Sequence, residues 1–223
     1  MRPISIEEAR KIDQDAVERL GMPSILLMEN ASRAVAEAAR EMIAAHHLDE
    51  VCVLCGPGNN GGDGLAVVRH LSGETPVRYW LLAEPDPERT PDAALQLRIL
   101  RNAGLEPEAA EPGPRDAALW IDALFGTGLA RVPGGRAAEW IRTANASGGA
   151  RLAVDIPSGL DGETGRLLDD GQGPCCFRAD RTVTFEAPKH GLVVDTARDH
   201  VGEIVVGRLG LPVRDPGNEP QLS

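Results

Sequence analysis

The sequence has little of what marks secreted or membrane-embedded proteins. Its four cysteines do not suggest a disulfide framework in a chain of 223 residues. No run approaches the roughly 18 consecutive apolar residues that a membrane-spanning helix needs. The N-terminus turns acidic at Glu7 and Glu8 and lacks the apolar segment of a secretion signal. We therefore expect a cytoplasmic protein that does not contact a membrane.

Positive charge is also scarce. The chain has 23 Lys and Arg residues against 34 Asp and Glu residues, which gives a formal net charge of −11. A nucleic-acid partner is not expected, because phosphate backbones require a concentrated basic face. A small phosphate-bearing ligand is still compatible with this charge, since backbone N–H groups at the start of a helix can hold a phosphate locally.

The spacing of apolar residues predicts two helices followed by alternating strands and helices. The first helix is expected at residues 6–20, with a capping box made by Ser5 and Glu8, and the second at residues 25–46, with Ser24 as its cap. The expected strands are 51–55, 77–82, 119–122, 152–156, 182–186 and 203–206, and the expected helices between them are 63–71, 91–103 and 136–144. This order is typical of an α/β fold with a mostly parallel sheet covered by helices on both faces.

The length of the chain is typical of a single domain, which we expect to span residues 1–212. The segment 159–178 is rich in glycine and charge and has little periodicity, so it is expected to be a loop. The polar tail at 213–223 is expected to be disordered.

Four loops that follow strands are dense in glycine, carboxylate, amide and hydroxyl groups. They lie at residues 56–64, 122–128, 155–162 and 186–191. Ligands of open parallel sheets bind in the crevice at the carboxyl ends of the strands. We therefore expect the four loops to converge on one binding site at that edge.

The loop after the first strand contains a possible dinucleotide-binding motif. Gly56, Gly58 and Gly61 satisfy G-x-G-x-x-G, and Glu84 lies at the end of the second strand, so an NAD-dependent dehydrogenase is one alternative. Pro57 and two adjacent asparagines are unusual for such a loop. A P-loop is excluded more firmly, because no Lys-Ser or Lys-Thr follows the glycines.

Oxygen-bearing side chains gather in the same loops. Asp122 and Asp155 each end an apolar strand, and Asn60 and Ser158 accompany them. Either aspartate alone could cap the segment that follows it. Together, with no cluster of His or Cys nearby, the four side chains favour a large, weakly hydrated cation over zinc.

One of the two lysines also lies in these loops. Apart from Lys11 and Lys189, every basic residue of the chain is an arginine. Lysine is a compact charge whose pKa the protein can tune, whereas arginine stays protonated. Lys189 is therefore a candidate for chemistry, with an ordinary surface lysine as the alternative, and its neighbour His190 is expected to be a solvated loop residue.

These loops resemble the signature of the NAD(P)HX epimerase family, also called the YjeF N-terminal domain. The similar segments are LMENA at 27–31, GNNGGDG at 58–64, DALFGTG at 122–128, VDIPSGLDG at 154–162, TVTF at 182–185 and PKHGL at 188–192. Their order along the chain makes the resemblance specific, whereas any single motif would not. The loop 162–178, with its Cys175-Cys176 pair, departs from the family pattern.

The resemblance implies a fold, an activity and partners. The fold would be a Rossmann-like three-layer αβα sandwich with two N-terminal helices, often paired as a homodimer. The activity would be interconversion of the R and S forms of hydrated NADH and NADPH (NADHX and NADPHX) in nicotinamide nucleotide repair. A separate ADP- or ATP-dependent dehydratase would then restore the S form, and because the chain stops shortly after Pro212 we expect that activity in another protein.

Carried over residue by residue, the resemblance also implies a binding site. Substrate contacts would come from Asn59, Asn60, Gly61, Gly62, Asp63, Gly126, Thr127, Gly128, Leu129, Ala130, Arg131, Val132 and Asp155. One potassium ion per subunit would sit among Asn60, Asp122 and Ser158, which matches the oxygen cluster found from the residues alone.

Epimerisation of such a substrate needs an acid and a base. The hydroxyl group is next to the ring nitrogen, whose lone pair can expel it as water, and the planar cation can be rehydrated from the other face. An acid and a base would each contribute about 10²–10⁴-fold. We expect Asp155 to be the acid–base group, with Lys189 modulating or sharing that role; ring opening to an aldehyde is an alternative route.

A binding module is an alternative of a different class, because the same fold occurs as a non-catalytic interaction domain in RNA-processing scaffolds. That alternative predicts loss of the acidic and amide positions. Asn60, Asp63, Asp122, Asp155 and Ser158 are all present, which favours the enzyme.

Overall fold

The structure, a computed structural model, describes residues 1–171 and 173–212. The tail expected to be disordered lies outside these residues. The strands are β1 (Glu50–Cys55), β2 (Val77–Leu81), β3 (Ala118–Ala123), β4 (Ala150–Val154), β5 (Arg181–Phe185) and β6 (Glu203–Gly207). The α-helices are α1 (Ile6–Glu18), α2 (Ser24–His46), α3 (Asn59–Leu71), α4 (Pro91–Asn102), α5 (Gly135–Ala146) and α6 (Arg198–Val201), with short 3-10 helices at His190–Leu192 and Asp195–Ala197.

The six strands form one sheet in the order β2-β1-β3-β4-β5-β6, and all neighbouring strands are parallel. The predicted α/β fold with its parallel sheet is confirmed. The chain moves outward from β1 to β2 and then crosses to β3 on the other side of β1. This reversal creates a crevice at the carboxyl ends of β1 and β3, where the ligands of such sheets bind.

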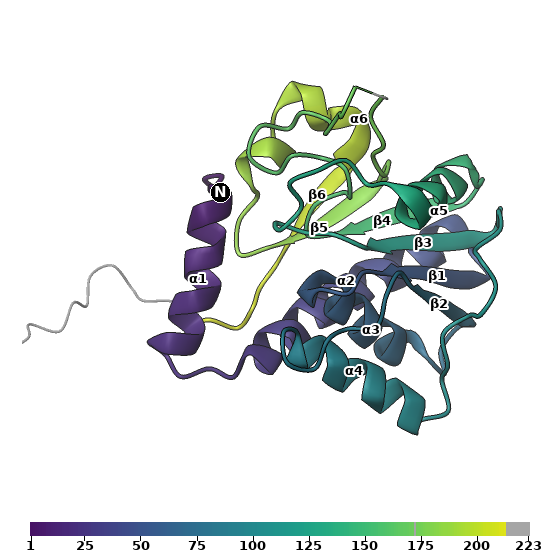
Figure 1. Cartoon of the computed structure of the whole chain (residues 1–223), viewed down its shortest axis with the longest axis horizontal. Helices are drawn as coiled ribbons and strands as arrows, with labels where there is room; N and C mark the ends of the chain where they lie inside the picture. Colours follow the sequence, from purple (N-terminus) through teal and green to yellow (C-terminus); the bar gives the residue numbers. More distant parts are fainter. Residues whose placement is uncertain (172, 213–223) are drawn as a thin grey trace, which may run out of the picture.

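Helices cover both faces of the sheet (Figure 1). On one face, α2, α3 and α4 pack over apolar side chains of the strands, and on the other face α5 packs over a second apolar cluster that includes Trp80 and Trp120. Cys52 and Cys55 belong to opposite clusters, as expected for strand residues of opposite parity. Because both faces are covered, five of the six β1 residues are buried, and the strand is almost entirely apolar.

The first two helices differ in how they begin. Ser5 and Glu8 form the predicted capping box of α1, in which each side chain accepts from the backbone N–H of the other residue. The predicted cap of α2 is wrong, because Ser24 is already the first helical residue and Pro23 occupies the capping position. Among the described helices, none is long and apolar enough to cross a membrane.

Helix α3 begins four residues earlier than predicted, at Asn59, and so includes glycines that sequence propensity assigns to a loop. The glycines let the helix approach its neighbours closely. A Cβ on Gly61 would lie 1.8 Å from the backbone oxygen of Gly56, and a Cβ on Gly62 would lie 2.6 Å from Cε of Met28. Close packing therefore fixes the position of the helix N-terminus at the crevice.

Candidate active site

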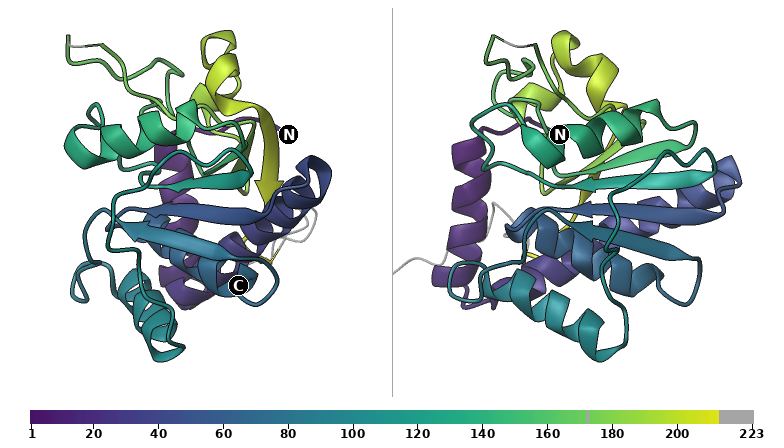
Figure 2. Two further views of the ribbon diagram at one scale, coloured as in Figure 1. Left: turned by 90° about the vertical axis from the view of Figure 1, so that its right-hand side faces the viewer. Right: turned by 45° about the vertical axis from the view of Figure 1, so that its right-hand side comes forward.

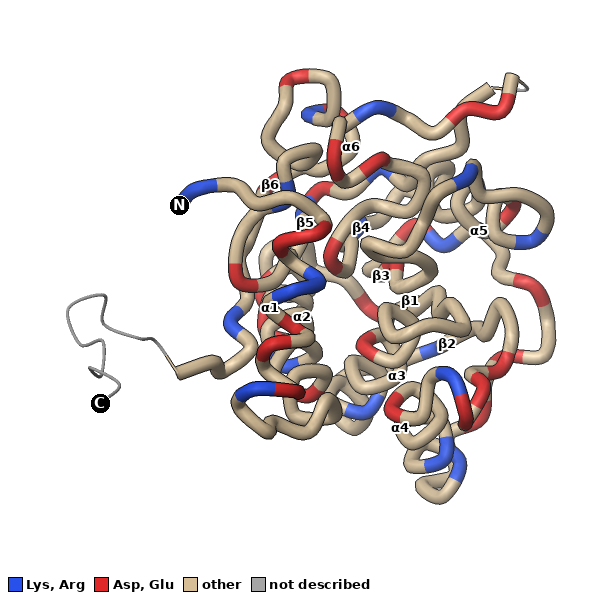
Figure 3. Tube along the Cα trace, turned by 60° about the vertical axis from the view of Figure 1, so that its left-hand side comes forward, with Lys and Arg blue, Asp and Glu red and all other residues tan. Residues whose placement is uncertain are grey.

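A cavity of about 390 Å³ opens at the carboxyl ends of the strands. Its walls come from α1, from the N-terminal parts of α2 and α3, and from the residues that follow β4 and β5. Figure 2 shows α1 standing beyond the strand ends, apart from the layers of helices that cover the sheet. Figure 3, which views the chain from the side of α1, shows several acidic positions around this region.

The N-terminal arm holds α1 in this place. Ile4 forms a parallel bridge with the segment after β5. The backbone N–H of Ile4 donates to the oxygen of Pro188 at 2.9 Å, and the N–H of His190 donates to the oxygen of Ile4 at 2.9 Å. These two hydrogen bonds flank Lys189, so the arm is paired with the segment that carries this lysine.

Lys189 and Asp155 form a buried ion pair at the base of the cavity. Nζ of Lys189 lies 2.7 Å from Oδ1 of Asp155, and the two residues are only 2% and 8% exposed. The ammonium group also donates to the Thr184 hydroxyl at 2.9 Å and to the Phe185 carbonyl at 3.3 Å, and Thr184 donates to Asp155 at 3.2 Å. The lysine therefore has three acceptors, which offset the cost of burying its charge.

The backbone at Asp155 is strained. Its φ is 66°, and Glu186 after the neighbouring strand has a φ of 60°. In both cases the flanking residues are joined by a backbone hydrogen bond; at Asp155 the N–H of Ile156 donates to the oxygen of Val154 at 2.9 Å. Such turns at non-glycine residues cost about 1–3 kcal/mol and cluster at functional sites. Asp155 and Glu186 both line the cavity, so the two strained backbone positions both belong to the site.

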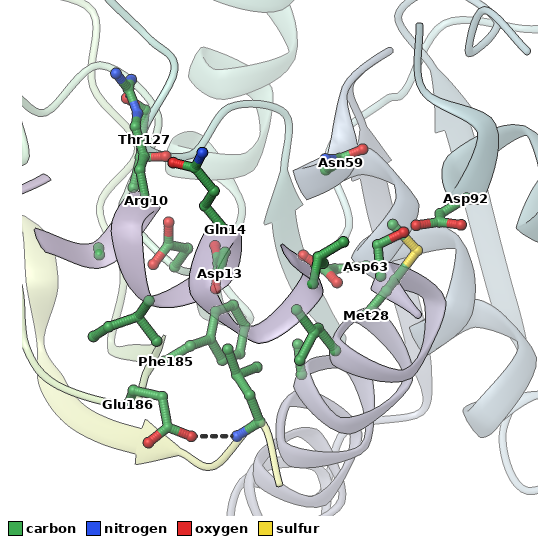
Figure 4. A pocket seen from close by; sticks show the side chains of 18 of the residues that line it. Arg10, Asp13, Gln14, Met28, Asn59, Asp63, Asp92, Thr127, Phe185 and Glu186 are labelled. Carbon is green, nitrogen blue, oxygen red and sulfur yellow. Dashed lines mark hydrogen bonds between the residues drawn. The ribbon is translucent and has the colours of Figure 1, made fainter. Parts of the chain in front are cut away.

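Two further aspartates line the same cavity, Asp13 from α1 and Asp63 from α3 (Figure 4). Within the described part of the chain neither carboxyl group has a hydrogen-bond or ion-pair partner. Desolvation by the surrounding protein raises the pKa of Asp13 to about 6, against the opposing charge of Lys189. Burial, and then the charges of Asp155 and Asp13, raise the pKa of Asp63 well above its usual value. The cavity thus combines an ion pair with two carboxyl groups whose pKa values are raised above their usual range.

Sequence reasoning missed Asp13. A signal was present, because the apolar positions Ala9, Ile12 and Ala16 define the inward face of the first helix and Asp13 lies on that face. The side chain of Asp13 is exposed, because this part of the face borders the open cavity.

Asp122 and Ser158, two of the predicted metal ligands, contact each other directly. The hydroxyl of Ser158 donates to Oδ1 of Asp122 at 2.8 Å, and its backbone N–H donates to Oδ2 at 2.7 Å. The N–H of Leu124 donates to Oδ1 at 3.1 Å. Both residues are fully buried, and burial raises the pKa of Asp122 to about 6 despite these hydrogen bonds.

Asn60, the third predicted ligand, faces the same loop. A Cβ on Gly126 would lie 3.1 Å from Oδ1 of Asn60 and 3.2 Å from Oδ2 of Asp155, so these two oxygens flank the glycine. The preceding residue, Phe125, donates its N–H to the Ser158 hydroxyl at 3.0 Å. The structure therefore brings Asn60, Asp122, Asp155 and Ser158 together around one short segment.

The predicted substrate contacts are placed unevenly. Asn59, Asp63, Thr127 and Asp155 line the cavity. Gly61 and Gly62 are buried in the packing of α3. All residues of the stretch 126–132 are described, and of these Thr127 alone lines the cavity; its backbone carbonyl accepts a hydrogen bond from Arg10 at 2.6 Å. The residues of this stretch that do not line the cavity are Gly126, Gly128, Leu129, Ala130, Arg131 and Val132.

The features expected of a dehydrogenase are not assembled here. Glu84, which would contact a ribose in that alternative, pairs with Arg101 on the surface and does not line the cavity. Gly61 lies inside α3 rather than in a preceding loop. The structure therefore gives this alternative no support beyond the spacing of three glycines.

Comparisons with known proteins agree with this geometry. A family model described as the N-terminus of YjeF-related proteins matches residues 24–191. An NAD(P)H-hydrate epimerase of Rhodopirellula baltica is 40% identical over 216 residues, which are 95% of this chain and 85% of that protein. One of Levilactobacillus brevis with the same name is 34% identical and is matched over 96% of both chains.

One further match is to part of a longer enzyme, and another is to a solved structure. A bifunctional NAD(P)H-hydrate repair enzyme of Thermofilum pendens is 36% identical, and the chain spans 41% of its length. The crystal structure of yeast ynu0 superimposes with a TM-score of 0.71 at 22% identity, over 92% of this chain and 87% of the yeast chain, which supports the fold. The family model matches most of the chain, and two relatives above 30% identity are matched over 85% and 96% of their length. The chain therefore belongs to the family of YjeF-related N-terminal domains.

Proposed function

We propose that the chain is an NAD(P)H-hydrate epimerase, an isomerase that interconverts the R and S forms of hydrated NADH and NADPH. One observation carries the proposal: the buried Asp155–Lys189 ion pair lies in a cavity that two further carboxyl groups, those of Asp13 and Asp63, also line. Relatives with this name match nearly the whole chain.

The reaction uses this arrangement as follows. An acid gives a proton to the substrate hydroxyl, the carbon–oxygen bond breaks with its electron pair on the departing water, and the lone pair of the ring nitrogen forms a C=N bond. Water then adds to the other face and gives a proton to a base, each catalyst contributing about 10²–10⁴-fold. Asp155 is the acid–base group, and Lys189 holds and orients it through the 2.7 Å contact.

The phosphates of the substrate would bind at the start of α3. The first intrahelical bond of this region runs from the N–H of Gly62 to the oxygen of Gly58, so the N–H groups of Asn59, Asn60 and Gly61 have no intrahelical acceptor. Such groups, together with the helix dipole, favour an anion. The segment 126–132 would cover the bound nucleotide from the opposite side.

A potassium ion would be held by Asn60, Asp122 and Ser158. The donor set fits, because amide, carboxylate and hydroxyl oxygens suit a large cation. Oδ1 of Asn60 faces Gly126, which directly follows the residue bonded to the Ser158 hydroxyl. Within residues 1–171 and 173–212, no group of three His, Cys, Asp or Glu side chains forms a metal cluster. The ion would supply positive charge that orders the loops and offsets the phosphates.

The enzyme would act as a cytoplasmic homodimer alongside a separate ADP- or ATP-dependent dehydratase. The bifunctional relatives support the second part, because the chain spans only 41% of the length of the Thermofilum pendens enzyme and the remainder could carry the second activity.

The direct test is to incubate purified R-NADHX with the protein alone and to follow the appearance of the S form by chromatography. Conversion above the rate without protein, with no consumption of a second substrate, is the expected result. A change in nicotinamide absorbance with a second substrate would instead indicate a redox enzyme, and binding without conversion would indicate an interaction module.

A further inference from the structure

The inward face of α1 carries a carboxyl group that the structure does not use for folding. Ala9, Asp13 and Ala16 share this face; both alanines are buried, whereas Asp13 stays accessible from the cavity. In Figure 4, Asp13 and Asp63 lie on opposite sides of the cavity, on α1 and α3 respectively.

A second aspartate of α1, Asp15, has the ion pairs that are typical of a carboxylate with a structural role. Asp15, two residues further on, pairs with Lys11 and Arg19 within the same helix. Asp13 has no such partner in the described chain. The charges that act on it belong to Lys189, Asp155 and Glu186, which all follow strands β4 and β5 on the other wall of the cavity. Asp13 therefore faces the ion pair across the space that a substrate would fill.

Epimerisation requires catalytic groups on two faces of a planar ring. Water leaves from one face and must return to the other, and a single carboxylate cannot reach both. Asp155 lies at the strand ends, so its counterpart must come from the wall formed by α1 or from the N-terminal part of α3.

We propose that Asp13 is a second catalytic residue, which transfers protons on the ring face opposite to the one served by Asp155. This inference rests on the epimerase function proposed above. In one direction Asp13 donates a proton to the hydroxyl and the C–O electron pair leaves with the water. Water then attacks the other face, the C=N pair returns to nitrogen, and the surplus proton goes to Asp155. Exchange with solvent then removes the proton from Asp155 and restores one to Asp13, so the overall change is inversion alone. The reverse reaction exchanges the two roles.

Protonation supports Asp13 over Asp63 in this role. The pKa of Asp13, about 6, lets it both hold and release a proton near neutral pH. Burial and the charges of Asp155 and Asp13 raise the pKa of Asp63 well above its usual value, and no cation opposes that shift as Lys189 does at Asp13.

The test follows inversion and oxygen exchange separately. R-NADHX and S-NADHX are incubated separately in H₂¹⁸O with the wild type and with Asp13→Asn. The opposite epimer and ¹⁸O in the hydroxyl are measured by chromatography and mass spectrometry. We expect Asp13→Asn to slow inversion by about 100-fold or more. Exchange should persist with the epimer whose hydroxyl lies on the side of Asp155, because Asp155 can still expel water and readmit it on its own face. Exchange should be lost with the other epimer.

Matched variants separate this role from folding. Asp15→Asn removes the same charge from the same helix outside the cavity, and its inversion rate should stay within about twofold of wild type. Asp13→Glu keeps a carboxyl group and should recover part of the inversion. Near-wild-type inversion in Asp13→Asn, exchange that persists or disappears with both epimers alike, or wild-type inversion without ¹⁸O uptake would each overturn the proposal. So would exchange without inversion in Asp63→Asn alone. If the wild type fails to invert R-NADHX at all, the proposed function itself is wrong.

Discussion

Asp122 and Asp155 lie at the carboxyl ends of neighbouring strands, yet their surroundings differ in kind. Asp122 is fully buried, and among the residues that the structure describes it accepts hydrogen bonds only from uncharged donors, two on Ser158 and one on Leu124. Asp155 is paired with the ammonium group of Lys189, and its second oxygen faces Gly126 beside the cavity. Two carboxylates at the carboxyl ends of neighbouring strands can therefore have different roles: Asp122 connects two loops by hydrogen bonds, whereas Asp155 is available for reaction in the cavity.

The difference also appears in the chain around each residue. Asp122 belongs to a regular strand, whereas Asp155 sits just beyond its strand with a positive φ. A residue whose task is structural can adopt relaxed geometry, while the strain at Asp155 has to be compensated by the surrounding bonds.

The largest expected effect comes from Asp155→Asn. Asparagine keeps the size of the side chain and can still accept from Lys189 and Thr184, so the fold should persist, but it cannot exchange a proton. The epimerisation rate should fall about 10³-fold, measured by conversion of R-NADHX to the S form, with circular dichroism as the check on folding. A rate close to that of the wild type would contradict the assignment of Asp155.

Lys189→Met tests the countercharge. It leaves Asp155 buried beside acceptors without its cation, and we expect a loss of about 3–5 kcal/mol in the free energy of unfolding, measured by urea denaturation near neutral pH. The double variant Asp155→Asn/Lys189→Met should lose less, because no uncompensated charge remains. Equal losses in the single and double variants would mean that Lys189 stabilises the fold by packing alone.

Ser158→Ala tests the neutral cluster and should have a smaller effect. It removes one donor to Asp122 and the acceptor of the Phe125 N–H, at a cost of about 1–3 kcal/mol in potassium-free buffer. The Ser158 hydrogen bonds lower a pKa that burial has raised to about 6, so they stabilise the ionised form of Asp122. The loss in the free energy of unfolding should therefore be greatest above pH 6 and shrink as the pH falls below 6. Urea denaturation on either side of pH 6 measures this difference.

Replacing potassium with sodium should have the smallest effect. If the ion positions the loops without taking part in proton transfer, kcat/KM should fall only several-fold. The response to potassium should vanish in Asp122→Asn and survive in Asp155→Asn, whose residual rate can be titrated with the salt. An equal response of both variants would break the distinction between the two aspartates.

Much of the fold follows from local pattern. Runs of buried apolar residues locate each strand to within two residues, because a parallel sheet covered on both faces leaves no alternative for them. The start of α3 cannot be predicted from local pattern, since its glycines have low helix propensity. They are needed because Gly61 lies against Gly56 and Gly62 lies against Met28. That requirement exists only in the packed molecule.

The site divides in the same way. The polar loops after β1, β3, β4 and β5 could be brought together in advance by the rule for parallel sheets. The contribution of α1 to the site could not be predicted, because the sequence pattern does not indicate that the first helix lies beyond the strand ends. The helical spacing places Asp13 on the same face as Ala9 and Ala16, but only the packed molecule places that face opposite Lys189 and Asp155.

The bridge between Ile4 and the segment around Lys189 has a practical consequence for anyone preparing this protein. Fusion of an affinity tag directly before Met1, or trimming of the first few amino acids, alters the strand partner of the peptide that carries the lysine. Recombinant material should therefore bear its tag at the opposite terminus or have it cleaved off before assays, and activities from differently tagged batches should not be pooled.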